Sequence, residues 1–112
     1  MRREHAPPEA ARAFSDVLDE VAVTGAVERT IWFGMPAAKV EGRIFLALWE
    51  GALVARLGAE EVDLRVAAGE GVRFDPSEKG KPFGDWLESN AEPDQWLELA
   101  FAALAFTASS ET

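Results

Sequence analysis

Residues 33–58, FGMPAAKVEGRIFLALWEGALVARLG, constrain the fold of this chain more than any other stretch. They are apolar almost throughout, yet Glu-Gly pairs at 41–42 and 50–51 interrupt them. Glycine tolerates positive φ, so each pair predicts a tight hairpin turn between two strands. The three strands should form an antiparallel meander over residues near 30–40, 43–49 and 52–57.

The middle strand of this meander is apolar on both faces. Side chains alternate along a strand, so Ile44, Leu46 and Leu48 should share one face, with Phe45 on the other. A strand with two apolar faces is expected to be central in its sheet and covered, at least in part, on both sides.

A third interruption, Gly34-Met35-Pro36, has two interpretations. It can be a bulge or bend in an edge strand, because glycine permits unusual φ and proline needs no partner in the hydrogen-bond ladder. Alternatively, Met35 can line a recognition groove, since methionine packs adaptably against varied partners.

The rest of the chain predicts three helices and two more strands. Apolar residues from Ala10 to Val21 recur at helical spacing and predict a helix over 8–23. A short helix is expected at 59–68, ending at Gly69. The two further strands are expected at 72–74 and 83–87.

The last helix is unusually apolar. Asn90 is expected to cap it. Its apolar residues, which include Trp96 and Phe101, cover well over half of its circumference. An arc this wide exceeds what packing on one sheet face normally needs, so we expect the helix to form a self-association surface, most simply in a homodimer.

These elements predict an α+β fold. It should have an N-terminal helix, an antiparallel sheet of about five strands built on the three-stranded meander, a short middle helix and an apolar C-terminal helix. With 112 residues the chain is expected to be one domain over 1–112, with 1–6 and 108–112 frayed.

The charge distribution argues against direct nucleic-acid binding. The net charge is -9, and residues 75–112 carry eight acidic groups but only two basic ones. No basic residue follows Lys81. Proteins that bind DNA or RNA need clustered Lys and Arg to displace counterions from phosphates, and this chain has no such cluster.

The sequence contains few residues that could take part in catalysis or bind a cofactor. The chain has no cysteine and a single histidine, His5, in the expected frayed start. Thiolate nucleophiles and sites with two or three histidine ligands are therefore excluded within one chain. We expect no enzyme activity and no cofactor or metal. Without a signal peptide or an apolar run long enough to span a membrane, the expected location is the cytoplasm.

A few residues remain as candidate partner or ligand contacts. Lys79 and Lys81 can bind an anion through their loop or can simply belong to a solvated turn. The four tryptophans can line a pocket or pack in the core. The candidate contacts are Met35, Trp49, Lys79, Lys81, Trp86, Trp96 and Phe101.

Several motifs resemble the N-terminal domain of the TfoX/Sxy family. They are Phe33-Gly34-Met35, Gly42-Arg43-Ile44-Phe45, Phe74-Asp75-Pro76, Gly80-Lys81-Pro82 and Trp86. With the apolar final helix, the resemblance spans residues 33–106. It implies an α+β domain linked to regulators of DNA-uptake competence, whose full-length members carry a second, helical C-terminal domain. The family offers no catalytic residues to carry over.

The sequence therefore predicts a non-catalytic protein-interaction or regulatory domain. The partner is expected to be another copy of the chain or another protein, with no nucleic acid and no membrane. The alternative is a small-ligand-binding module that uses an aromatic-lined pocket on the sheet.

Overall fold

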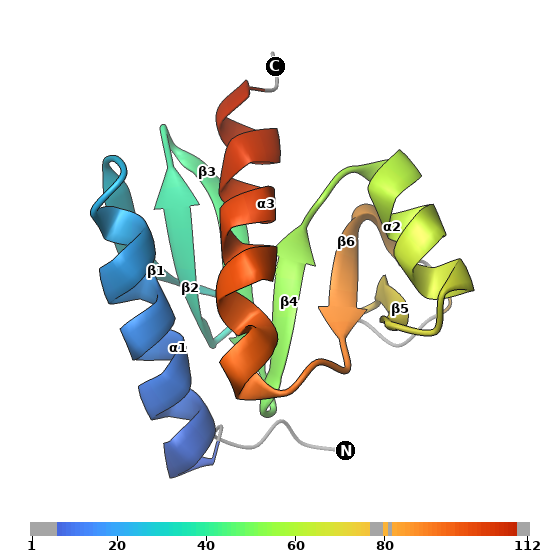
Figure 1. Ribbon diagram of the computed structural model, residues 1–112, viewed down its shortest axis with the longest axis horizontal. Coiled ribbons are helices and arrows are strands. Elements are labelled where there is room, and N and C mark those ends of the chain that lie inside the picture. The colour runs from blue at the N-terminus through green and yellow to red at the C-terminus, as the bar shows by residue number, and fades with distance from the viewer. Residues whose placement is uncertain (1–6, 77–79, 81, 110–112) are drawn as a thin grey trace.

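The computed structural model describes residues 7–76, 80 and 82–109. One antiparallel sheet contains the described strands in the order β1-β2-β3-β4-β6-β5, and the helices pack in front of it in Figure 1. The helices are α1 (Pro8–Ala22), α2 (Ala59–Ala67), the 3-10 helix η1 (Pro93–Gln95) and α3 (Trp96–Ser109). The strands are β1 (Val27–Trp32), β2 (Met35–Val40), β3 (Arg43–Trp49), β4 (Ala52–Arg56), β5 (Gly71–Phe74) and β6 (Phe83–Ser89).

The predicted α+β class and its order of elements are confirmed, but the sheet has six strands where about five were expected. The extra strand arises because residues 30–40, expected to form one strand, are divided between β1 and β2. Phe33 and Gly34 turn the chain between β1 and β2, with φ values of 53° and 79°. The prediction of a bend in a single edge strand was therefore wrong.

The same turn occurs three times along the chain. The pairs Phe33-Gly34, Glu41-Gly42 and Glu50-Gly51 all have positive φ at both residues. This is the geometry of a two-residue type I′ hairpin, whose twist matches that of the strands it joins. Phenylalanine rarely adopts positive φ, which is why the first turn is hard to recognise in the sequence.

Pro36 is accommodated in β2, which is an internal strand because β1 is the edge. It lies opposite Ile31 of β1, whereas pairing between β2 and β3 begins only at Ala37. The missing N–H of Pro36 therefore removes no bond from the β2–β3 ladder.

A β-bulge in β3 changes which side chains share a face. The register between β2 and β3 shifts because Ala38 faces Leu46 while Lys39 faces Ile44, so Phe45 is the extra residue. Phe45 joins Leu46 and Leu48 in the core beneath the helices, and Ile44 packs against the opposite cluster. The alternation expected for β3 thus fails at one residue, although its central position and its burial on both faces are confirmed.

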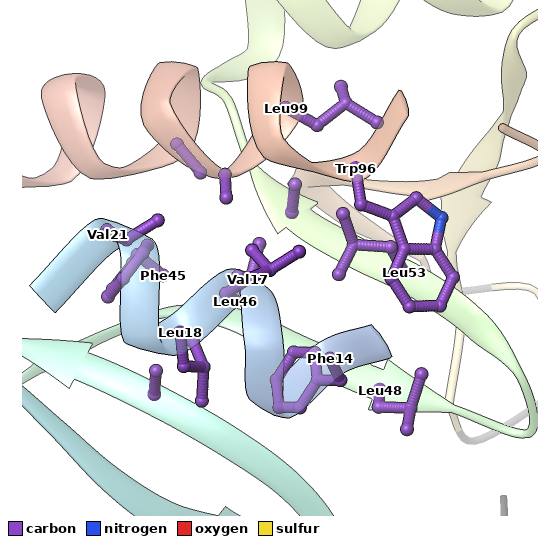
Figure 2. Close-up of a cluster of buried hydrophobic side chains, with 14 of the residues drawn as sticks. Phe14, Val17, Leu18, Val21, Phe45, Leu46, Leu48, Leu53, Trp96 and Leu99 are labelled. Carbon is purple, nitrogen blue, oxygen red and sulfur yellow. The ribbon is translucent and has the colours of Figure 1, made fainter. Parts of the chain in front are cut away.

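The main core lies between the sheet and the helices. Figure 2 shows Phe14, Val17 and Leu18 of α1 beside Phe45 and Leu46 of β3. Val62 of α2, several residues of α3 and further residues of β2, β4 and β6 also belong to this cluster. It explains why α1 carries its apolar residues at helical spacing, because that stripe is the face that packs on the sheet.

The opposite face of the sheet holds a second, smaller core built from strand residues alone. Trp32 of β1 and Trp86 of β6 lie there with ring centroids 4.6 Å apart. Four strand-to-strand steps separate β1 from β6, which in a flat sheet would amount to roughly 19 Å. The sheet therefore curls strongly around this aromatic cluster, which is why no helix is needed to bury it.

The predicted bounds of the other elements can be compared with the structure. The helices predicted at 8–23 and 59–68 are observed within two residues at each end, and so are the strands at 72–74 and 83–87. Residues 1–6 and 110–112, expected to fray, lie outside the described residues, whereas 108 and 109 belong to α3. Within the described ranges, no helix combines the length and apolar character needed to cross a membrane.

Candidate functional site

The candidate contact residues fall into three groups. Met35 is 2% exposed, and Trp49, Trp86 and Trp96 are also buried. Phe101 is 37% exposed on α3. Lys79 and Lys81 lie outside the described residues, so the anion-binding hypothesis stays a prediction. The burial of Met35 also argues against the second interpretation of Gly34-Met35-Pro36, in which Met35 lines an open groove.

The tryptophans are distributed between both cores and do not meet in one place. Trp96 packs in the core beneath the helices, where its indole nitrogen donates to the carbonyl of Ala91 at 3.1 Å. Trp49 and Trp86 belong to the aromatic cluster on the other face. There the rings pack on one another, as when Phe74 meets Trp49 edge to face at 5.5 Å. Core packing accounts for these contacts.

Helix α3 occupies the middle of the helical layer, beside α1 and in front of β3 and β4 (Figure 1). Its sheet-facing residues Trp96, Ala100 and Ala103 are buried. Leu97 and Leu104 pack partly against the same core. This central position explains much of the apolar arc that the sequence shows.

The outward side of α3 is nevertheless apolar as well. Phe101, Ala105 and Ala108 are exposed, and they follow one another at helical spacing. After Glu98 the helix carries no charged residue to its end at Ser109. A solvent-facing helix surface normally carries charged side chains, so this uncharged outward face is a candidate contact surface.

A groove separates α2 from α3, and we call it the α2–α3 groove. Its first part is a cavity of about 470 Å³ lined mainly by Leu57, Gly58, Leu64 and Phe106, together with Glu60 and Glu61. Glycine at 58 has a φ of 91°, and an added Cβ would lie 2.6 Å from the ring of Phe106. The guanidinium carbon of Arg56 lies 5.2 Å from the centroid of the same ring. The ring of Phe106 thus packs close to Gly58 and interacts with the Arg56 guanidinium at this apolar end.

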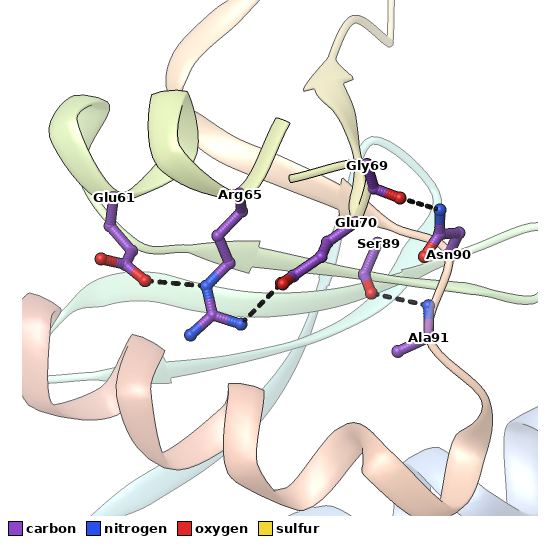
Figure 3. A network of polar contacts seen from close by, with 7 residues as sticks. All are labelled: Glu61, Arg65, Gly69, Glu70, Ser89, Asn90 and Ala91. Atoms are coloured by element: carbon purple, nitrogen blue, oxygen red, sulfur yellow. Dashed lines mark hydrogen bonds and ion pairs between the residues drawn. The ribbon is translucent and has the colours of Figure 1, made fainter. Parts of the chain in front are cut away.

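The second part of the groove is polar and holds about 360 Å³. Figure 3 shows Arg65 between two carboxylates, with its Nε 2.8 Å from Glu61 and its Nη1 3.3 Å from Glu70. Glu61 lines the first cavity and Arg65 the second, so this ion pair links the linings of the two cavities. The segment after β6 closes the polar end.

The role predicted for Asn90, as the cap of the last helix, was wrong. Asn90 does not cap α3, which begins at Trp96 after η1. Instead its Nδ2 donates to the carbonyl of Gly69 at 2.9 Å and ties the segment after β6 to the end of α2. Pro93, which suits the first turn of a helix, was the signal for the later start.

The α2–α3 groove is strongly acidic. Its lining has one guanidinium, that of Arg65, and five carboxylates, so its formal net charge is -4; the acidic residues are Glu60, Glu61, Glu70, Glu92 and Glu98. Within the described part of the chain, Glu60, Glu92 and Glu98 have no ion-pair partner. The basic residues that would neutralise them are missing from the sequence after Lys81.

Two other features of the structure lie outside the groove. Burial raises the pKa of Glu88 on β6, and the nearby carboxylate of Glu50 raises it further. Another cavity, of about 280 Å³, lies beside α1 and is lined mostly by apolar residues, including Phe14, Leu18 and Ile31. Neither brings together groups suited to catalysis.

Among the residues that the structure describes, no three His, Cys, Asp or Glu side chains gather to hold a metal ion. Comparisons with protein families, with curated proteins and with solved structures found no significant match to this chain.

Proposed function

We propose that this chain is a non-catalytic protein-interaction or regulatory domain that forms a homodimer through the outward face of α3. The observation that carries this proposal is the absence of charge on that face beyond Glu98, where Phe101 and two alanines are exposed. Apolar residues clustered on an exposed helix usually mark an interface.

The charge of the molecule limits where a second copy can bind. Two chains with a net charge of -9 repel each other, and this repulsion costs least where the faces that meet carry no charge. The outward face of α3 meets this requirement, and a two-fold axis would place the same face of each chain against the other. The small side chains of Ala105 and Ala108 permit close approach of two helices.

The motifs of the TfoX/Sxy N-terminal domain support a regulatory role, and we propose this relationship on the sequence resemblance alone. We also propose a cytoplasmic location, which agrees with the lack of cysteine. The alternative of a small-ligand-binding module on the sheet has less support, because the aromatic rings there pack on one another.

Size-exclusion chromatography with light scattering tests the proposal. We expect a mass of twice the 12.2 kDa chain mass, with a monomer appearing only on dilution. A protein that stays monomeric over a wide range of concentration would refute the dimer.

A further inference from the structure

We propose that the α2–α3 groove binds a segment of another protein that carries Lys or Arg side chains next to a large apolar one. The inference rests on the proposed function only in that the domain acts through protein contacts. It concerns a surface distinct from the outward face of α3.

The apolar end of the groove fits one large apolar side chain. Its cavity is lined by Leu57, Leu64 and Phe106, and Leu64 is 63% exposed. The fold leaves the apolar surface of this leucine in contact with water. Covering it with a partner's side chain would therefore favour binding.

The polar end fits a cationic group. Glu92 and Glu98 line it without an ion-pair partner among the described residues, and Asn90 and Gln95 add amide groups. Arg65 does not neutralise them, because it is already engaged by Glu61 and Glu70. A Lys or Arg of a partner would supply the missing positive charge.

The Glu61–Arg65 ion pair links the linings of the two ends, so one short segment can reach both. This combination selects the chemistry of the partner. A purely basic segment would leave Leu64 uncovered, and a purely apolar one would leave the carboxylates unpaired. Nucleic acid is disfavoured because phosphates would meet five carboxylates.

Selection from a displayed library of random peptides, about twelve residues long, on the immobilised protein tests this proposal. We expect enrichment of peptides in which Lys or Arg neighbours Leu, Ile, Met or an aromatic residue. The strongest peptide is then labelled and titrated against the protein and its variants. Its binding should weaken as salt is added.

The decisive variant is Glu60→Gln/Glu92→Gln, which removes one charge from each end of the groove. It should weaken binding about fivefold to tenfold, from two partly exposed charge contacts. The matched control is Glu9→Gln/Glu20→Gln, which removes the same charge from exposed positions on α1. It should leave binding within twofold of the unaltered protein.

A second pair of variants tests the apolar end. Leu64→Ser should weaken binding, whereas Val23→Ser, at a residue 82% exposed at the end of α1, should not. Both positions face solvent, so neither change is expected to unfold the protein.

Three results would overturn the proposal. They are the absence of any enriched peptide, equal effects of the two carboxylate variants, and complete competition by spermidine, which would assign the groove to small polycations. A dimer that selects no peptide refutes the groove alone. A monomer that selects basic and apolar peptides refutes only the α3 interface.

Discussion

Met35 packs in the aromatic cluster of the helix-free face of the sheet, where only 2% of it is exposed. Met35→Ala should therefore cost about 2–5 kcal/mol in the free energy of unfolding, because it leaves a cavity among rings that cannot close it. Denaturant unfolding measures this loss, with Ile31→Ala as the control, since Ile31 is 67% exposed. A change at Met35 as small as that at Ile31 would show that Met35 is not a core residue.

Glu88 provides a prediction about pH. Burial, and then repulsion from Glu50, raises its pKa above the ordinary value. The folded state therefore holds the proton more tightly than the unfolded state, so this group favours folding at low pH and opposes it once both states are ionised.

Replacement by Gln should remove this dependence. Glu88→Gln should raise the free energy of unfolding at neutral pH, and its advantage should shrink as pH falls through the raised pKa. Thermal unfolding between about pH 4 and pH 8 checks this, with Glu9→Gln on exposed α1 as the control. A variant less stable than the original protein at neutral pH would contradict the burial argument.

At the scale of elements, the position of α2 depends on Gly58. Its φ of 91° with a ψ of 150° suits glycine alone, and a Cβ there would press on the ring of Phe106. Gly58→Ala should cost about 1–3 kcal/mol of stability and disturb the apolar end of the α2–α3 groove.

Gly25→Ala is the matched control for this prediction. Nothing lies within 4 Å of the Cβ that it would add, and its backbone is not in the left-handed region. Chemical denaturation of both variants should show a loss only at Gly58. Equal losses at the two positions would mean that the contact with Phe106 is not important.

The elements also show how much of the fold the sequence could predict. Helices with one apolar stripe, such as α1, and hairpins with Glu-Gly turns were recognised because each feature is local. The turn at Phe33-Gly34 was missed because phenylalanine is a rare residue at positive φ. The bulge at Phe45 was missed because an apolar strand shows no alternation to reveal it.

The candidate surfaces were less predictable than the fold. The apolar excess of α3, a local feature of the sequence, singled out Phe101, and the structure shows only that this residue is exposed. The α2–α3 groove was not foreseen, since Glu61, Arg65 and Asn90 come together only through the packing of α2 beside the segment that follows β6. The periodicity and turn signals of a sequence do not predict contacts between residues that are far apart along the chain.

For the whole molecule, the net charge of -9 predicts that the protein does not bind nucleic acid. Titration against labelled duplex and single-stranded DNA at about 150 mM salt should show no saturable binding, because no cluster of Lys and Arg can release counterions. Micromolar affinity that falls steeply with salt would overturn this expectation.

The central claim is that the outward face of α3 joins two copies of the chain. Sedimentation equilibrium of Phe101→Glu tests it most directly, beside the control Ile31→Glu, which adds the same charge at another exposed apolar residue. If the account is correct, the protein and the Ile31 variant sediment as dimers, whereas Phe101→Glu sediments as a monomer with its helical circular dichroism intact. Dimers of equal stability in all three proteins would contradict it, as would monomers in all three.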